Sequence, residues 1–166
     1  MRDGGYDLEF VAFAAGARVR LRRVAYAMCG DWHHAEDIVQ AALVKVYLAW
    51  ARVEADLGAW SYARRAVVNV AIDSSRRPWR REDVSDDLPD RAVAEPGGLD
   101  DALLEALSAL PARQRAVVVP RYVEGLDIET VAELLGVSSG TVKSQAARGL
   151  DAMRRRLSAT PATDHR

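Results

Sequence analysis

Apolar residues recur at steps of three and four along most of the chain, which is the period of amphipathic α-helices. Three such stripes cover residues 6–28, 32–53 and 59–77. Pro78 ends the third stripe, because proline lacks the backbone N–H that an α-helix needs. Alternation of the strand type is absent. The pattern therefore predicts an all-α fold.

A fourth helical pattern covers residues 99–110, and Pro111 separates it from a helix that starts near Ala112. Pro120 lies inside that next helix. Its ring removes one hydrogen bond and clashes with the preceding turn, so we expect a kink or break over residues 117–119.

Residues 82–98 show no apolar period and contain acids together with proline and glycine, which favours a flexible linker. We therefore predict two small helical domains, residues 1–81 and 99–157, followed by a disordered tail, residues 158–166. The net charge of −1 hides a segregation of charge, because arginines precede the acidic linker and follow it. The arginines of the first helix are interpreted as mostly solvated: Arg18, Arg20, Arg22 and Arg23.

The segment from Asp127 to Leu150 has the form of two helices joined by a tight turn. Gly136 suits a left-handed turn residue, Ser138 or Ser139 can cap the next helix, and Val137 is expected to return to the core. An ordinary corner between two core helices is the alternative. We favour a DNA-binding helix-turn-helix, because the second helix carries polar side chains on its outer side: Ser139, Thr141, Lys143, Ser144, Gln145 and Arg148.

Aromatic and arginine side chains are interleaved at the start of the third helix, in the residues Trp60, Tyr62, Arg64 and Arg65. Such rings can stack on exposed bases while guanidinium groups bind phosphates, which suits single-stranded nucleic acid. Core aromatics beside solvated arginines explain the pattern equally well. One turn apart, Asn69 and Asp73 could form a local hydrogen-bonded pair.

The composition argues against several other classes of protein. Cys29 is the only cysteine, so no internal disulfide can form, and we interpret it as a small buried residue at a helix end. With His33, His34 and His165 it makes no convincing metal site, and no cofactor is expected. No catalytic constellation is present, so we expect no enzyme. We also expect a cytoplasmic location without membrane insertion, because neither a signal peptide nor a run of about 20 apolar residues occurs.

Three collinear segments resemble the extracytoplasmic-function class of bacterial RNA polymerase sigma factors. GDWHHAEDIVQAALVKVYLAW is similar to regions 2.1–2.2 and WSYARRAVVNVAIDSSRR to regions 2.3–2.4 of that class. LSALPARQRAVVVPRYVEGLDIETVAELLGVSSGTVKSQAARGLDAMRRRL is similar to region 4. The resemblance covers almost the whole chain, and it is greatest to the SigE-like factors of high-GC actinobacteria.

The resemblance implies a promoter-specificity subunit that binds core RNA polymerase and promoter DNA. Asp37, Gln40 and Lys45 would bind the clamp helices of the largest polymerase subunit, and region 4 would bind the flap of the second largest. The −10 element would be opened and read by Asp56, Trp60, Tyr62, Arg64, Arg65, Asn69, Asp73, Arg76 and Arg77. The helix that begins at Ser139 would read the −35 element, and an anti-sigma factor is a possible further partner.

Two positions depart from the pattern of the class. Gln145 stands where members often carry arginine, and glutamine pairs with adenine whereas arginine prefers guanine. Pro120 replaces a usual apolar residue. Two other functions are alternatives to the sigma factor: a stand-alone helix-turn-helix regulator, and a decoy that binds polymerase or an anti-sigma factor without reading DNA.

Overall fold

The computed structural model describes residues 4–55, 58–75 and 100–159. Every regular element within these ranges is a helix, which confirms the all-α prediction. Asp56, Arg76, Arg77 and the predicted linker lie outside the described residues, as does the tail from residue 160. None of the described helices is both long enough and apolar enough to span a bilayer.

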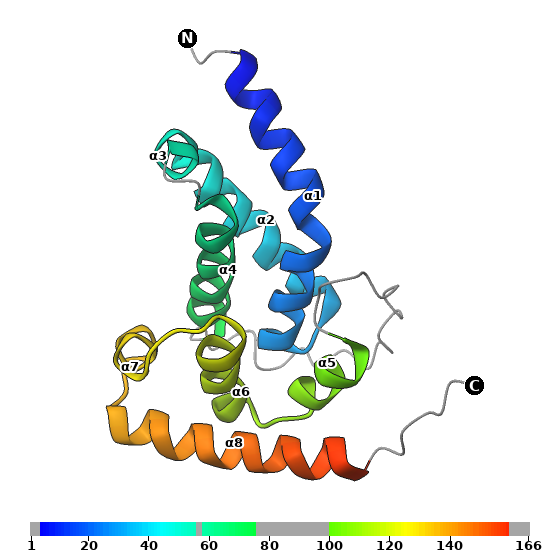
Figure 1. Cartoon of the computed structure of the whole chain (residues 1–166), viewed down its shortest axis with the longest axis vertical. Coiled ribbons are helices and arrows are strands. Elements are labelled where there is room, and N and C mark those ends of the chain that lie inside the picture. The colour runs from blue at the N-terminus through cyan, green and yellow to red at the C-terminus, as the bar shows by residue number, and fades with distance from the viewer. Residues whose placement is uncertain (1–3, 56–57, 76–99, 160–166) are drawn as a thin grey trace, which may run out of the picture.

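The N-terminal region consists of α1 (Gly4–Cys29), α2 (Trp32–Leu48), α3 (Trp50–Ala55) and α4 (Ala59–Ser75). The long helices α1, α2 and α4 pack on one another, and the N-terminal end of α1 projects past α3 (Figure 1). Asp31 caps α2 as its side chain accepts from the backbone N–H of His33 at 2.9 Å. Cys29 lies at the end of α1, as expected, but it is half-buried rather than fully buried.

The single helix expected over residues 32–53 is wrong, because the chain turns at Ala49 and starts a new helix at Trp50. The turn places the Trp50 ring in the core, edge-on to Phe10 at 5.5 Å and tilted against Phe13 at 5.2 Å. Aromatic packing of this kind stabilises by about 0.5–1.5 kcal/mol beyond the burial itself. Tertiary contact with α1 therefore decides where α2 ends.

The C-terminal region contains α5 (Asp101–Ser108), α6 (Ala112–Val118), the π-helical turn η2 (Val119–Val123), α7 (Ile128–Leu135) and α8 (Ser139–Ala159). The irregularity expected at Pro120 is confirmed. After Val118 the backbone widens, and the N–H of Glu124 bonds the carbonyl of Val119 at 3.1 Å. Proline cannot complete the α-helical ladder, so a π-turn is a physically reasonable response.

The helix-turn-helix of α7 and α8 forms largely as predicted. Gly136 adopts a φ of 67°, in the left-handed region, and Ser138 caps α8 by accepting from the N–H of Thr141 at 3.1 Å. Val137 does not return to the core: its backbone N–H closes the turn on the carbonyl of Ala132, and its side chain is exposed. Leu126 is buried in that small core instead.

The two regions share one hydrophobic core. Apolar side chains of the C-terminal region join the cluster built by α1, α2 and α4: Leu104, Leu107, Leu110, Val118, Val119 and Met153. Figure 1 shows α5 beside the end of α1, and α6 and α7 below α4. A second, smaller cluster holds the helix-turn-helix together. The two predicted domains are therefore docked against each other.

Arg23 lies at this junction and is only 2% exposed, so the prediction that its side chain is solvated is wrong. One of its Nη atoms lies 3.4 Å from a carboxylate oxygen of Asp101 at the start of α5. The remaining arginines of the first helix, Arg18, Arg20 and Arg22, are at least partly exposed, as expected. The sequence could not distinguish Arg23 from them, because its partner lies 78 residues away.

Gly149 lies where α8 crosses α6 most closely. A Cβ atom built there would lie 2.5 Å from a methyl group of Val118, which is fully buried and stiff at χ1. We predict that Gly149→Ala lowers the free energy of unfolding by about 1–3 kcal/mol, since overpacking outweighs the gain in helix propensity. Urea unfolding measures the change.

Gly16→Ala is the matched control, because a Cβ atom at Gly16 meets nothing within 4 Å on the same kind of helical backbone. It should raise the free energy of unfolding by about 0.5–1 kcal/mol. Equal effects of the two substitutions would contradict the close approach of α6 and α8.

Candidate nucleic-acid interface

The outer face of α8 presents three of the predicted DNA contacts together. Thr141, Ser144 and Arg148 are exposed and follow one another at steps of three and four, which places them on one side of the helix. The opposite side packs into the molecule through Val142 and Met153. This arrangement leaves the polar side of α8 accessible along its whole length.

Lys143 and Gln145 lie on opposite flanks of this face, since two residues turn an α-helix by about 200°. Lys143 is exposed and lines a groove between η2 and α8 together with Arg121 and Arg154. Gln145 is half-buried on the other flank. The two residues therefore cannot contact the same base, and only the Lys143 flank carries a basic groove.

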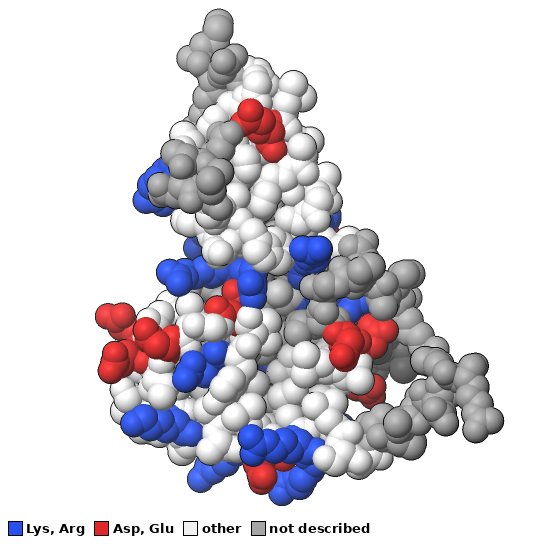
Figure 2. Space-filling model, viewed as in Figure 1, with Lys and Arg blue, Asp and Glu red and all other residues white. Residues whose placement is uncertain are grey.

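Figure 2 shows basic side chains gathered along α8 and acidic ones over α7. The basic residues of α8 are Lys143, Arg148, Arg154, Arg155 and Arg156. At the start of α7, the backbone N–H of Thr130 bonds Asp127 at 2.7 Å and lowers the pKa of that carboxyl. Five basic side chains of the C-terminal region therefore lie on α8, which favours binding of an anionic backbone there.

The exposed face of α4 brings together four other predicted contacts. Tyr62, Arg65, Asn69 and Asp73 are spaced three, four and four residues apart, so they form one row. Arg65 and Asp73 are exposed, and the other two are half-buried. The two side chains are one turn apart on α4, but the hydrogen bond suggested between Asn69 and Asp73 is not observed. The Asn69 side-chain oxygen is buried without a hydrogen-bond partner.

A hollow lies beside this row, at the junction of α2, α3 and α4. It is lined by Lys45, Leu48, Arg52 and Tyr62, with the guanidinium carbon of Arg52 5.8 Å from the centre of the Tyr62 ring. An aromatic face and two cations around an open hollow are suited to a stacked base and its phosphates. Arg52 was not among the residues predicted from the sequence.

Trp60 and Arg64 point away from the row formed by Tyr62 and Arg65. Trp60 packs against the core, with the guanidinium groups of Arg20 and Arg64 near its ring at 5.8 and 5.7 Å. Arg64 reaches the C-terminal region, where it donates to Glu124 at 3.0 Å and to the carbonyl of Val123 at 2.5 Å. In this docked arrangement, neither side chain belongs to the exposed face of α4.

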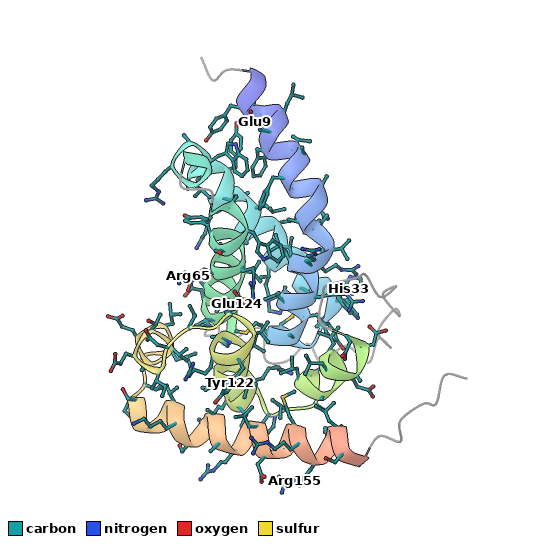
Figure 3. All side chains as sticks on the ribbon, viewed as in Figure 1. Glu9, His33, Arg65, Tyr122, Glu124 and Arg155 are labelled. Atoms are coloured by element: carbon teal, nitrogen blue, oxygen red, sulfur yellow. The ribbon has the colours of Figure 1, made fainter. Side chains whose placement is uncertain are left out.

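Glu124, the partner of Arg64, lies at the junction between the two regions (Figure 3). Its side chain is only 5% exposed. Burial raises the pKa of Glu124, and the positive charge of Arg64 opposes that shift without cancelling it. The ion pair therefore orients the junction more than it strengthens it, as is common for buried pairs.

The exposed face of α2 carries the three residues predicted to bind polymerase, Asp37, Gln40 and Lys45, all of them exposed. Between and beyond them are two large apolar side chains, Val44 and Leu48, which are 59% and 68% exposed. Sequence reasoning passed over both. The signal was present, since two aliphatic residues four apart interrupt an otherwise polar helical face.

The described residues contain no group of three histidine, cysteine or acidic side chains that could hold a metal ion. Burial raises the pKa of Cys29 to about 11. Its thiol is therefore mostly protonated at neutral pH and a poor nucleophile.

Comparison with known proteins identifies relatives of both regions. Residues 17–81 match the family model for sigma-70 region 2, and residues 100–153 match that for sigma-70 region 4. The RNA polymerase sigma-E factor of Streptomyces coelicolor is 33% identical over 162 residues, covering 92% of this chain and 88% of that protein. The sigma-E factor of Streptomyces avermitilis is 35% identical over 156 residues, covering 92% and 87%.

A solved structure has a similar fold: the sigma factor RpoE of Bartonella quintana, in complex with the anti-sigma factor NepR. Its TM-score is 0.60 at 24% sequence identity, and the match covers 91% of this chain and 98% of that one. At this identity the comparison shows that the fold is shared.

The raised pKa of Glu124 predicts a pH dependence of stability. Glu124 binds its proton more tightly in the native state than in the unfolded chain, so protonation of Glu124 stabilises the fold. This stabilisation is complete at pH values below the unfolded pKa. It is lost as the pH rises through the folded pKa. We predict that the stability of the parent protein relative to Glu124→Gln falls as the pH rises from about 4 to 7. Urea unfolding at several pH values measures it.

Glu133→Gln, on the exposed side of α7, controls for the loss of a negative charge. A relative stability that instead rises with pH would mean that attraction to Arg64 outweighs the cost of burying the Glu124 carboxylate.

Proposed function

This chain belongs to the extracytoplasmic-function class of the sigma-70 family. From that premise we propose which promoter element and which polymerase surface each of its two helical regions binds. As a sigma factor, it is the promoter-specificity subunit that directs transcription initiation by bacterial RNA polymerase. Its partners are therefore core polymerase and promoter DNA. It contributes recognition and positioning in the cytoplasm, with no catalytic chemistry of its own.

The −35 element is read by α8. The observation that carries this proposal is the exposed polar row of Thr141, Ser144 and Arg148, backed by a fully packed opposite face. A helix held in this way enters the major groove as one rigid body. Arg148 binds a base edge or phosphate, and Lys143 binds the backbone from its flank. Gln145, on the other flank, favours adenine where an arginine would favour guanine.

The −10 element is held by the exposed face of α4 and the hollow next to it. Tyr62 stacks on an unpaired base, and Arg65 and Arg52 bind neighbouring phosphates. Asn69 is half-buried in the same row, and its side-chain oxygen is buried without a partner, so its proposed role is to position the exposed residues beside it. Asp56, Arg76 and Arg77 complete this site in the proposal, although they lie outside the described residues.

Core polymerase binds the exposed face of α2. Val44 and Leu48 supply apolar contact area, while Asp37 and Gln40 supply polar contacts that fix the orientation. Apolar centres with polar rims are typical of protein interfaces. The clamp helices of the largest subunit are the proposed partner here, and the flap of the second largest subunit binds the C-terminal region.

The docked arrangement is a closed form that must open on the promoter. The −35 and −10 elements are named for positions about 25 base pairs apart, which is about 85 Å of duplex. Helix α8 is only about 31 Å long, and it packs in the same body as α4. The 24 residues between Ser75 and Asp100 can span at most about 85 Å when extended, which suffices for opening.

Opening also releases Arg64. In the closed form its guanidinium is engaged by Glu124 and by the carbonyl of Val123, so it cannot reach DNA. Separation of the two regions would free Arg64, which is one of the predicted −10 residues. Binding to polymerase thereby makes the −10 residues available for DNA. An anti-sigma factor that prevents the separation of the two regions would block DNA binding by the protein.

Loss of Arg148 tests the −35 role. We predict that Arg148→Ala lowers promoter-specific run-off transcription by about tenfold or more, because a bidentate base contact contributes about 1–3 kcal/mol. Binding to core polymerase should be largely retained, since the proposed polymerase face of α2 is unaltered and lies on the other region. The assay combines sigma-free core polymerase, a promoter fragment, and a separate measurement of complex formation with core.

Arg113→Ala is the matched control, as it removes one exposed arginine from α6, outside the proposed DNA face. Unchanged initiation by Arg148→Ala would reject the −35 role. A parent protein that binds core polymerase without restoring specific initiation would favour the polymerase-binding decoy. Specific initiation that needs another sigma factor would favour the stand-alone regulator.

A further inference from the structure

The outer side of α1 is an apolar surface that no described element covers. Leu8, Val11 and Val19 are 72%, 60% and 40% exposed, and the small residues Ala12 and Ala15 between them are exposed as well. The inner side of the same helix packs on α2 and α3. The N-terminal end of α1 projects past α3 in Figure 1.

The spacing of this surface is that of a helix-pairing seam. Leu8, Ala12, Ala15 and Val19 follow one another at steps of four, three and four, which is the heptad repeat. Their sizes run large, small, small, large. A second copy in antiparallel orientation sets Leu8 against Val19 at both ends of the seam and Ala12 against Ala15 at its centre. The central alanines let the two helix axes approach closely.

The charges beside the seam fit the same antiparallel pairing. Asp7 and Arg18 are eleven residues apart, about three full turns, so they lie on the same flank of the helix. In an antiparallel pair, Asp7 of each copy therefore lies near Arg18 of the other. Asp7 accepts from the Tyr47 hydroxyl at 2.8 Å, and Arg18 pairs with Glu36. These contacts with α2 fix the positions of both charges, and both residues remain exposed.

From these observations we infer that α1 is a docking surface for a second copy of this chain, in an antiparallel homodimer centred between residues 13 and 14. The contact is one helical face, which is smaller than the interfaces of permanent dimers. A dissociation constant on the order of 100 µM is therefore expected, and the dimer forms at high protein concentration.

Analytical ultracentrifugation of the full chain across a range of concentrations tests the inference. The parent protein should shift from monomer to dimer, and Ala15→Lys or Ala12→Glu should each weaken association at least about tenfold, because each places unpaired charge in the seam. An equimolar mixture of the two variants should restore dimers, because Glu at position 12 of one copy then faces Lys at position 15 of the other.

Ala147→Lys, on the exposed face of α8, is the matched control and should dimerise like the parent protein. A parent protein that stays monomeric throughout would overturn the inference, as would dimers that both α1 variants leave intact. If the single variants disrupt the dimer and their mixture does not restore it, the antiparallel register is wrong. Circular dichroism confirms that each variant is folded.

Discussion

Burial of apolar side chains between the N-terminal and C-terminal regions is the interaction on which the rest of the structure depends. Leu104, Leu107, Val118 and Val119 are almost completely buried, and they belong to the same cluster as the helices of the N-terminal region. Full burial of one aliphatic side chain contributes about 1.5–3 kcal/mol. The ion pairs at the junction contribute orientation, as the raised pKa of Glu124 indicates.

The shared core explains why the closed form is stable alone, whereas the open, promoter-bound form needs a partner. Exposing only two of the shared aliphatic side chains to water would cost about 3–6 kcal/mol. Opening therefore requires a surface that covers them, and core polymerase is the natural candidate. Once both regions are tethered on one polymerase, the second DNA contact becomes intramolecular, and weak individual contacts suffice for recognition.

Helical periodicity predicted the fold class and most helices because it depends only on neighbours in the sequence. The effects of Gly136 and Pro120 could be predicted for the same reason, since each residue acts on its own turn of backbone. Three features could not be predicted in this way: the break at Ala49, the burial of Arg23 and the exposure of Val137. Each is decided by packing between distant segments or by competition for a small core.

The candidate site divides in the same way. The row on α8 follows from helical spacing, so its members could be named in advance. The direction of Arg64 could not, because its partner Glu124 lies 60 residues away on the other region. Val44 and Leu48 lie off the predicted buried stripe of their helix, so their exposure could have been inferred from the sequence, whereas their exposed fractions are known only from the structure.

The separation of the two regions is the most direct measure of this account. Fluorescence energy transfer between dyes at Ser61 on α4 and Ser158 on α8, both exposed, reports it once Cys29 is replaced by alanine. The free protein should show one population with high transfer, and the active polymerase–promoter complex should show low transfer, with the dyes moved apart by tens of ångströms to match about 85 Å of duplex. The same transfer efficiency in both states, in a complex that initiates transcription, would contradict the closed form.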